Sequence, residues 1–233
     1  MKNSNTFRFL IPLFLFAICF SSKDAQGQSI VEFQTSLGDI EIQLFDNTRP
    51  ISVANFLGYV NRGDYAGTIF HRTQSIANGQ GIDIVQGGGF LTNGSSIPRL
   101  APIVNEAASN PNPLNTTGTI AFARTSVLDS ATSEFFFNAS DSPALDAQIF
   151  TVFGEVTQGF DIVTQILNLN TIDGDGPGAG PFDDLPVVDP NNGVAVSNLI
   201  VLESASVVSA IPEPASAVVL ALIGAVGFTR RRR

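Results

Sequence analysis

Short segments that alternate apolar and polar residues recur along the middle of the chain, and this period of two limits the fold more than any other feature. Residues 29–35 and 38–45 both show it, and turn residues at 36–39 join them, so they predict an opening β-hairpin. The same reasoning predicts further strands, which lie at residues 69–70, 82–86, 118–124, 134–138, 149–156 and 199–208. Many short strands favour an all-β closed barrel, in which closure hides the strand edges.

Helical spacing of apolar residues occurs in two segments. The first has apolar residues at positions 53, 56, 57 and 60, with Ser52 as the predicted N-cap and an end near residues 61–63. The second runs from Phe160 to Leu167. Residues 168–198, which we name the excursion, are rich in Gly, Pro and Asp and are interpreted as a long loop.

Residues 1–27 are interpreted as a secretory signal. Lys2 and Arg8 precede an apolar run from residue 9 to residue 20, and small residues stand at the two positions that a signal peptidase reads, so cleavage is expected after Gly27. An N-terminal membrane anchor is the alternative, although the run is shorter than the roughly 20 residues of a spanning helix. The one cysteine, Cys19, lies in this leader, so neither a disulfide nor thiol chemistry is expected in the domain that follows.

Residues 210–233 form a second terminal signal. Pro212-Glu213-Pro214 is followed by an apolar segment, residues 215–228, and then by Arg230 to Arg233. This order resembles the PEP-CTERM sorting signal of Gram-negative bacteria. The resemblance implies transient membrane association through the apolar segment, processing by an exosortase-type enzyme, and delivery to the periplasm, cell surface or extracellular matrix. A plain C-terminal tail anchor is the alternative.

The composition of the segment between the two terminal signals argues against nucleic-acid and metal partners. Residues 28–211 contain five Arg, no Lys and 19 Asp or Glu, which gives a formal charge of −14. Such a surface repels phosphate backbones, so nucleic-acid binding is not expected. One His without Cys does not make a zinc site, and no EF-hand spacing is present, so neither a metal nor a cofactor is expected. Each remaining Arg is then informative, because Arg offers a planar fork of donors that Lys lacks.

The segments 70–72 and 84–90 carry the most informative polar residues. His71 and Arg72 directly follow an apolar pair, and Gln86 leads into the triple-glycine turn 87–89. We expect these segments to be neighbouring strands whose Arg72 and Gln86 project into one groove. Arg72 has the alternative of an exposed ion pair, and His71 can be a structural hydrogen-bonding residue or a general base. The glycines superficially suggest a phosphate loop, but the usual Lys or GxGxxG spacing is lacking.

Five stretches in order resemble the cyclophilin pattern, and the resemblance covers Ile30 to about Val208. They are residues 70–72, 86–88, 118–124, 130–137, and 145–146 with 153–154. The resemblance implies a cyclophilin-like domain at residues 28–209, folded as a closed eight-stranded antiparallel barrel capped by two α-helices. It also implies peptidyl-prolyl cis-trans isomerase activity toward proline-containing polypeptides.

The same resemblance assigns the site residues. Arg72 matches the catalytic Arg, and Gln86 matches the Gln that holds Arg and substrate. The proline pocket is implied by Ile84, Phe136 and Leu145, with Phe150 extending its apolar wall. The remaining implied substrate-binding residues are His71, Ala123, Arg124 and Glu134.

Three departures from the family pattern bear on activity. Glu134 stands where the family usually has Gln, and we expect its carboxylate near Arg72. The segment 73–83 is longer than usual, and Asp83 occupies the place of an aromatic pocket residue. Ala144 replaces an often aromatic residue, so strong cyclosporin binding is not expected.

These features define three functional hypotheses. The first is an exported isomerase that assists the folding of surface or matrix proteins. The second is a catalytically weak module that binds proline-containing segments in the cell envelope or extracellular matrix. The third is a purely structural surface protein. The first predicts faster exchange of an X–Pro peptide, the second predicts binding without turnover, and the third predicts neither.

Overall fold

The computed structural model describes residues 28–108, 113–178 and 180–210. The main sheet has nine antiparallel strands in the order β3-β11-β1-β2-β8-β6-β7-β5-β4. Its strands are β1 (Ser29–Thr35), β2 (Gly38–Leu44), β3 (Thr68–Ile69), β4 (Arg72–Gln74), β5 (Ile84–Gly87), β6 (Thr119–Phe122), β7 (Phe135–Asn138), β8 (Val152–Gln158) and β11 (Val201–Ala210). The all-β class and the opening hairpin are confirmed.

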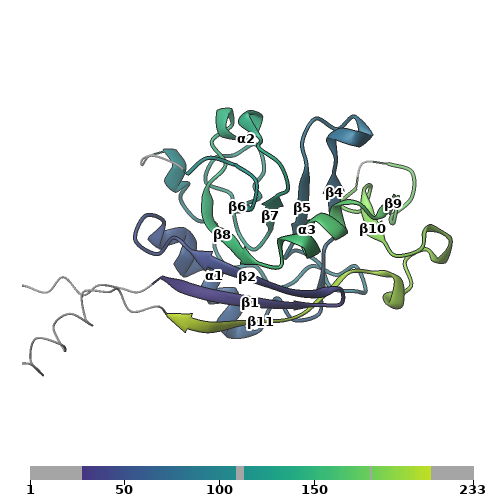
Figure 1. Cartoon of the computed structure of the whole chain (residues 1–233), viewed down its shortest axis with the longest axis horizontal. Helices are drawn as coiled ribbons and strands as arrows, with labels where there is room; N and C mark the ends of the chain where they lie inside the picture. Colours follow the sequence, from purple (N-terminus) through teal and green to yellow (C-terminus); the bar gives the residue numbers. More distant parts are fainter. Residues whose placement is uncertain (1–27, 109–112, 179, 211–233) are drawn as a thin grey trace, which may run out of the picture.

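The sheet is curled (Figure 1), and its two end strands, β3 and β4, are consecutive in the chain. The predicted strand at residues 69–70 is interrupted there. The backbone N–H of Phe70 donates to Ile200 on one side, at 3.0 Å, and that of His71 donates to Gln86 on the other, also at 3.0 Å. The strand count is therefore nine rather than eight, and closure into a barrel stays a prediction.

The core follows from the predicted alternation of the strands. Val31 and Phe33 on β1 and Ile40 and Ile42 on β2 are fully buried, while the residues between them are not. Phe33 also lies in an aromatic cluster at the centre of the sheet, with ring centroids 5.4 Å from Phe135 and 5.9 Å from Phe56. Period two thus sends every second side chain into one core.

The first predicted helix is α1 (Pro50–Arg62), and its N-terminus differs from the prediction. Pro50 starts the helix, because its fixed φ suits the first helical position and it needs no N–H partner. Ser52 is inside the helix and is not the N-cap. Instead, the carboxylate of Glu106 accepts hydrogen bonds from the N–H of Ile51 at 3.2 Å and of Ser52 at 2.8 Å.

The second predicted helix is confirmed with the same bounds as α3 (Phe160–Leu167). The described residues contain one further α-helix, the short α2 (Pro143–Ala147), so the prediction of two α-helices missed one. α2 lies directly before β8 and carries Leu145, which is buried.

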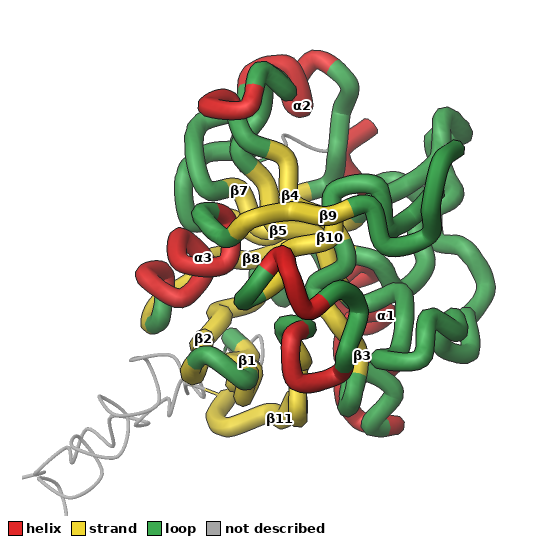
Figure 2. The backbone as a smooth tube through the Cα atoms, turned by 90° about the vertical axis from the view of Figure 1, so that its right-hand side faces the viewer, coloured by secondary structure: helices red, strands yellow, loops and turns green. Residues whose placement is uncertain are grey.

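The excursion contains regular structure that the sequence interpretation did not predict. Strands β9 (Asn170–Ile172) and β10 (Leu185–Val187) pair antiparallel in a separate two-stranded sheet. They lie in front of β4 and β5 in Figure 2 and pack around a small apolar cluster with Ile69 and Leu199. The excursion therefore forms a wall beside the end of the main sheet that carries Arg72.

Candidate active site

Arg72 and Gln86 face each other across neighbouring strands, as the sequence predicted. Arg72 of β4 is the register partner of Gln86 of β5, which in turn pairs with Phe136 of β7. Phe136 pairs with Ala121 of β6, so these four residues form one row across the sheet. Residues in such a row point to the same face.

A cavity of about 320 Å³ lies over this row. Its apolar floor belongs to a cluster that packs apart from the main core and contains Ile84, Phe136 and Leu145. Its lining consists of Arg72, Gln74, Ile82, Ile84, Gln86, Ala123, Arg124, Phe136, Leu145, Gln148 and Phe150. The structure thus brings together every predicted site residue except His71 and Glu134.

Ile82 is a lining residue that the sequence interpretation missed. It packs against the apolar cluster of the cavity, next in the chain to Asp83. The Asp83 carboxylate is turned away from the cavity and accepts a hydrogen bond from the N–H of Ile76 at 2.8 Å. Ile82 thus lines the cavity at this position, and Asp83 does not.

Two smaller cavities, each of about 230 Å³, adjoin the first and share Gln86 with it. One also has Arg99, Ala123 and Glu134 in its lining. The other has His71, Arg72 and Glu134 on the sheet side and residues 180–184 of the excursion on the opposite side. Together the three cavities form a groove with Gln86 at their junction.

Glu134 lies at the centre of the groove and lines the same cavity as Arg72, in keeping with the expected proximity, but its own ion pairs are with His71 and Arg99. Its carboxylate accepts a hydrogen bond from the Gln86 amide at 2.9 Å and from Arg99 at 3.3 Å, and lies 3.6 Å from Nε2 of His71. Burial alone would raise the pKa of Glu134, but the interactions with His71, Gln86 and Arg99 outweigh it and lower that pKa below its ordinary value. Glu134 is therefore a fixed anion that orients Gln86.

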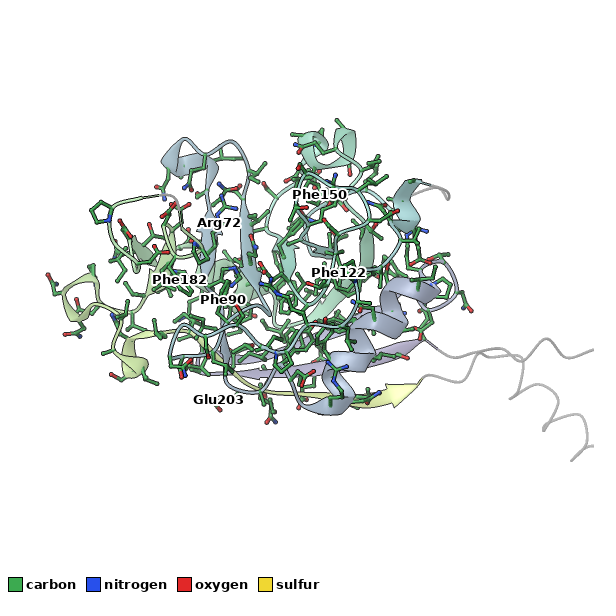
Figure 3. All side chains as sticks on the ribbon, turned by 180° about the vertical axis from the view of Figure 1, so that it is seen from behind. Arg72, Phe90, Phe122, Phe150, Phe182 and Glu203 are labelled. Atoms are coloured by element: carbon green, nitrogen blue, oxygen red, sulfur yellow. The ribbon has the colours of Figure 1, made fainter. Side chains whose placement is uncertain are left out.

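The acidic partner of Arg72 is Asp184, which no sequence pattern indicated. Oδ2 of Asp184 lies 3.7 Å from Nε of Arg72. The two side chains are 24% and 38% exposed, so the pair sits at the rim of the groove. Figure 3 shows Arg72 on the same side of the molecule as Phe90 and Phe182. Residues 112 positions apart in the chain, 72 and 184, thus meet at the site.

Arg124 and Phe150 form the opposite rim. The guanidinium of Arg124 lies 4.5 Å from the centroid of the Phe150 ring and donates to the carbonyl oxygen of Gln148. Phe150 follows Ile149, whose φ of 54° is rare for a β-branched residue. The N–H of Ala123 donates to the Glu134 carbonyl at 2.9 Å, so it is already used within the sheet.

His71 is buried beside the groove and packs between aromatic rings. It is 1% exposed, and its ring centroid lies 4.9 Å from that of Phe90 and 6.4 Å from that of Phe182. This environment fits a packing residue whose Nε2 faces Glu134 at 3.6 Å, while its buried Nδ1 has no hydrogen-bond partner among the described residues.

The triple-glycine turn allows the chain to pass close to the site. Gly88 has a φ of 77°, and a Cβ there would come within 2.7 Å of Phe135 and 2.8 Å of the Ser133 carbonyl oxygen. A Cβ on Gly89 would lie 2.9 Å from Glu134. The glycines therefore serve close packing against the site residues.

Three exposed carboxylates of the excursion come together without a predicted motif. The ligand oxygens of Asp173, Asp175 and Asp183 lie within 4.8 Å of one another. Such groups are common on acidic surfaces without an ion, and nothing else among the described residues points to a ligand there.

The fold and the site together define a class of protein: a curled β-sheet that presents an Arg beside a cavity with an apolar floor, large enough for a small ring. The chain matches the family described as cyclophilin type peptidyl-prolyl cis-trans isomerase/CLD over residues 30–185. The PEP-CTERM protein-sorting motif matches residues 210–233.

Similar proteins carry the same description. The chain is 46% identical to a peptidyl-prolyl cis-trans isomerase of Acinetobacter baylyi over 154 residues, which cover 64% of this chain and 78% of the relative. It is 38% identical to peptidyl-prolyl cis-trans isomerase A of Dickeya dadantii over 178 residues, which cover 75% and 82%. A crystal structure of a cyclophilin type peptidyl-prolyl cis-trans isomerase from Cryptosporidium parvum shares the fold, with a TM-score of 0.58 at 22% identity over 78% of this chain and 98% of that one.

The chain therefore belongs to the cyclophilin-type peptidyl-prolyl cis-trans isomerase family and is an enzyme of that class. Cyclophilins act on proline-containing polypeptides, and the PEP-CTERM motif points to export in Gram-negative bacteria. In the part of the chain that the structure describes, no helix is long and apolar enough to cross a membrane. The leader 1–27 and the apolar segment 215–228 lie outside the described residues.

Proposed function

We propose that Arg72 accelerates prolyl isomerisation by donating a hydrogen bond to the prolyl nitrogen as that nitrogen becomes pyramidal. The barrier of roughly 18–20 kcal/mol exists because the nitrogen lone pair is delocalised into the carbonyl. A donor that stabilises the localised lone pair lowers this barrier without a nucleophile, base or cofactor. The observation that carries the proposal is the position of Arg72 at the edge of a cavity of about 320 Å³ whose floor is apolar.

The remaining predicted residues divide the work of binding in this proposal. Ile84, Phe136 and Leu145 hold the proline ring, because they form the apolar floor of the cavity. Gln86 contacts the substrate beside Arg72, and Glu134 fixes the orientation of the Gln86 amide. These assignments are supported by burial and hydrogen bonding in the groove.

In the same proposal, the two terminal signals determine where the enzyme acts. Signal peptidase removes residues 1–27, the domain at 28–209 carries the activity, and an exosortase-type enzyme processes the tail at 210–233 after transient membrane association. The motif at the C-terminus supports delivery to the cell surface or extracellular matrix. The clients are proline-containing segments of proteins that fold there.

Arg72→Ala in the full chain tests the proposed mechanism. We expect kcat/KM for an X–Pro peptide to fall by about 100- to 1000-fold, as when one transition-state donor is removed. Arg62→Ala is the matched control, because Arg62 is exposed, pairs with Asp64 and does not line the groove. Parent-like activity of Arg72→Ala would refute the role of Arg72. A change in peptide affinity with little exchange in either protein would favour the binding module.

A further inference from the structure

Asp184 docks on the exposed edge of β4 through both its main chain and its side chain. The N–H of Thr73 donates to the carbonyl oxygen of Asp184 at 3.0 Å. The amide of Gln80 donates to Oδ1 of Asp184 at 2.9 Å, which leaves Oδ2 facing Nε of Arg72 at 3.7 Å. The carboxylate is thus held from two sides before it meets the guanidinium.

The residues around Asp184 are packed, so its position is well defined. Leu185, the next residue, is 2% exposed and begins β10. Phe182 stacks edge-on against Phe90 with ring centroids 5.0 Å apart. Figure 3 shows Phe182, Phe90 and Arg72 gathered on one side of the molecule. The excursion therefore delivers a carboxylate to Arg72 on a supported segment.

We propose that Asp184 is a positioning residue for Arg72, and this inference rests on the catalytic role proposed for Arg72. The Arg72 side chain is 38% exposed, so packing alone does not fix it. Among the described residues, the acidic group that pairs with Arg72 within 4.0 Å is that of Asp184. The carboxylate of Glu134 interacts instead with His71, Gln86 and Arg99. Holding one side of the guanidinium removes rotamer freedom before the transition state is reached.

The geometry favours positioning over inhibition. Asp184 faces Nε, which is one of several N–H groups of the guanidinium, so the Nη donors stay free for the prolyl nitrogen. At 3.7 Å the contact is an ion pair longer than a direct hydrogen bond, so it orients the group without saturating it. Loss of Asp184 is therefore expected to lower the rate.

Asp184→Asn in the full chain removes the charge and little else. The main-chain bond to Thr73 is kept, and the new amide oxygen can still accept from Gln80. We expect kcat to fall about tenfold with KM nearly unchanged, since a misplaced group affects the transition state more than binding. The melting temperature should stay near that of the parent, because exposed ion pairs add little stability.

Asp175→Asn is the matched control. Asp175 also lies in the excursion and is exposed, but it lines none of the three cavities of the groove and does not pair with Arg72. We expect its kcat to stay within about twofold of the parent. Asp184→Glu, which keeps a carboxylate, should recover part of the rate lost in Asp184→Asn.

A double variant separates failure of this inference from failure of the proposed function. If Asp184 acts through Arg72, then Asp184→Asn has no further effect in an Arg72→Ala background. Inactive Arg72→Ala with parent-like or faster Asp184→Asn would overturn the inference alone. Active Arg72→Ala would refute the catalytic role of Arg72, whatever the second substitution does. An equal loss in Asp175→Asn and Asp184→Asn would show a general charge effect and also overturn the inference.

Discussion

The main sheet and the excursion both supply a carboxylate to the groove, but they hold it in different ways. Glu134 directly precedes β7, its carbonyl oxygen accepts from the N–H of Ala123, and its half-buried carboxylate meets His71 and Gln86. Asp184 stands in a segment of short strands and turns and is placed by local hydrogen bonds to Thr73 and Gln80.

This difference predicts that substitutions in the two regions affect different properties of the protein. A residue anchored on the nine-stranded sheet can shift only if several backbone hydrogen bonds of the sheet break together. A residue held by a small satellite cluster can be released by a local opening at lower cost. We therefore expect substitutions in the sheet to change the global free energy of unfolding, and substitutions in the excursion to change the groove first.

Gly88→Ala is expected to have the largest effect on stability and tests the rigidity of the sheet. The φ of 77° is strained for Ala, and the new Cβ would lie 2.7 Å from Phe135. We expect a loss of roughly 4 kcal/mol in the free energy of unfolding, from strain and overpacking together. Chemical denaturation measures it.

Gly79→Ala is the control for Gly88→Ala. Gly79 has a φ of 79°, but no heavy atom lies within 4 Å of a Cβ built there. It should cost only about 1 kcal/mol, which is the backbone penalty alone. Equal losses at both positions would show that the sheet yields around Gly88, and the contrast in rigidity between the two regions would be lost.

The sequence predicted those parts of the fold whose signals are local. Alternation fixed which residues of β1 and β2 are buried, and helical spacing gave α3 its observed bounds. Short motifs also pointed to Arg72, Gln86 and Phe136, which strand register places in one row, while their roles stay predictions. Local pattern and strand pairing act together there.

The parts that the sequence did not predict depend on contacts between distant residues. The cap of α1 is Glu106, 54 residues from Ser52, whereas local capping rules pointed to Ser52 itself. Asp184 meets Arg72 only because β9 and β10 fold the excursion back onto β4. A segment rich in Gly, Pro and Asp carries no periodic pattern from which such a return could be inferred.

Leu185→Ala, with an intermediate effect, tests whether the excursion opens independently. Leu185 is 2% exposed in the satellite cluster, and truncation should cost about 2 kcal/mol. Native-state hydrogen exchange should then show faster exchange of the Thr73 amide, which donates to Asp184, while the Phe45 amide, which donates to Phe153, stays protected.

Leu44→Ala is the matched truncation in the sheet. Leu44 is fully buried in the main core, so we expect a loss of about 3–4 kcal/mol and faster exchange at both amides. If Leu185→Ala also exposes both amides to the same extent, the excursion and the sheet unfold as one unit.

Glu134→Gln, with the smallest expected effect, tests how firmly the sheet holds its own carboxylate. The pKa of Glu134 is lowered from its ordinary value of 4.5 by interactions that outweigh the effect of burial. A lowered folded-state pKa adds stability above the unfolded pKa, and this contribution is lost as the pH falls through the folded value. The variant should therefore be less stable than the parent at neutral pH and lose less stability as the solution is acidified below about pH 4.5. Urea unfolding between neutral pH and pH values below 4.5 gives the slope of the free energy of unfolding against pH for each protein. Substitution of the exposed Glu203, Glu203→Gln, is the control. Identical slopes for parent and Glu134→Gln would mean that the Glu134 carboxylate is no better held than an exposed one, and the contrast with the rim carboxylate Asp184 would then be one of location alone.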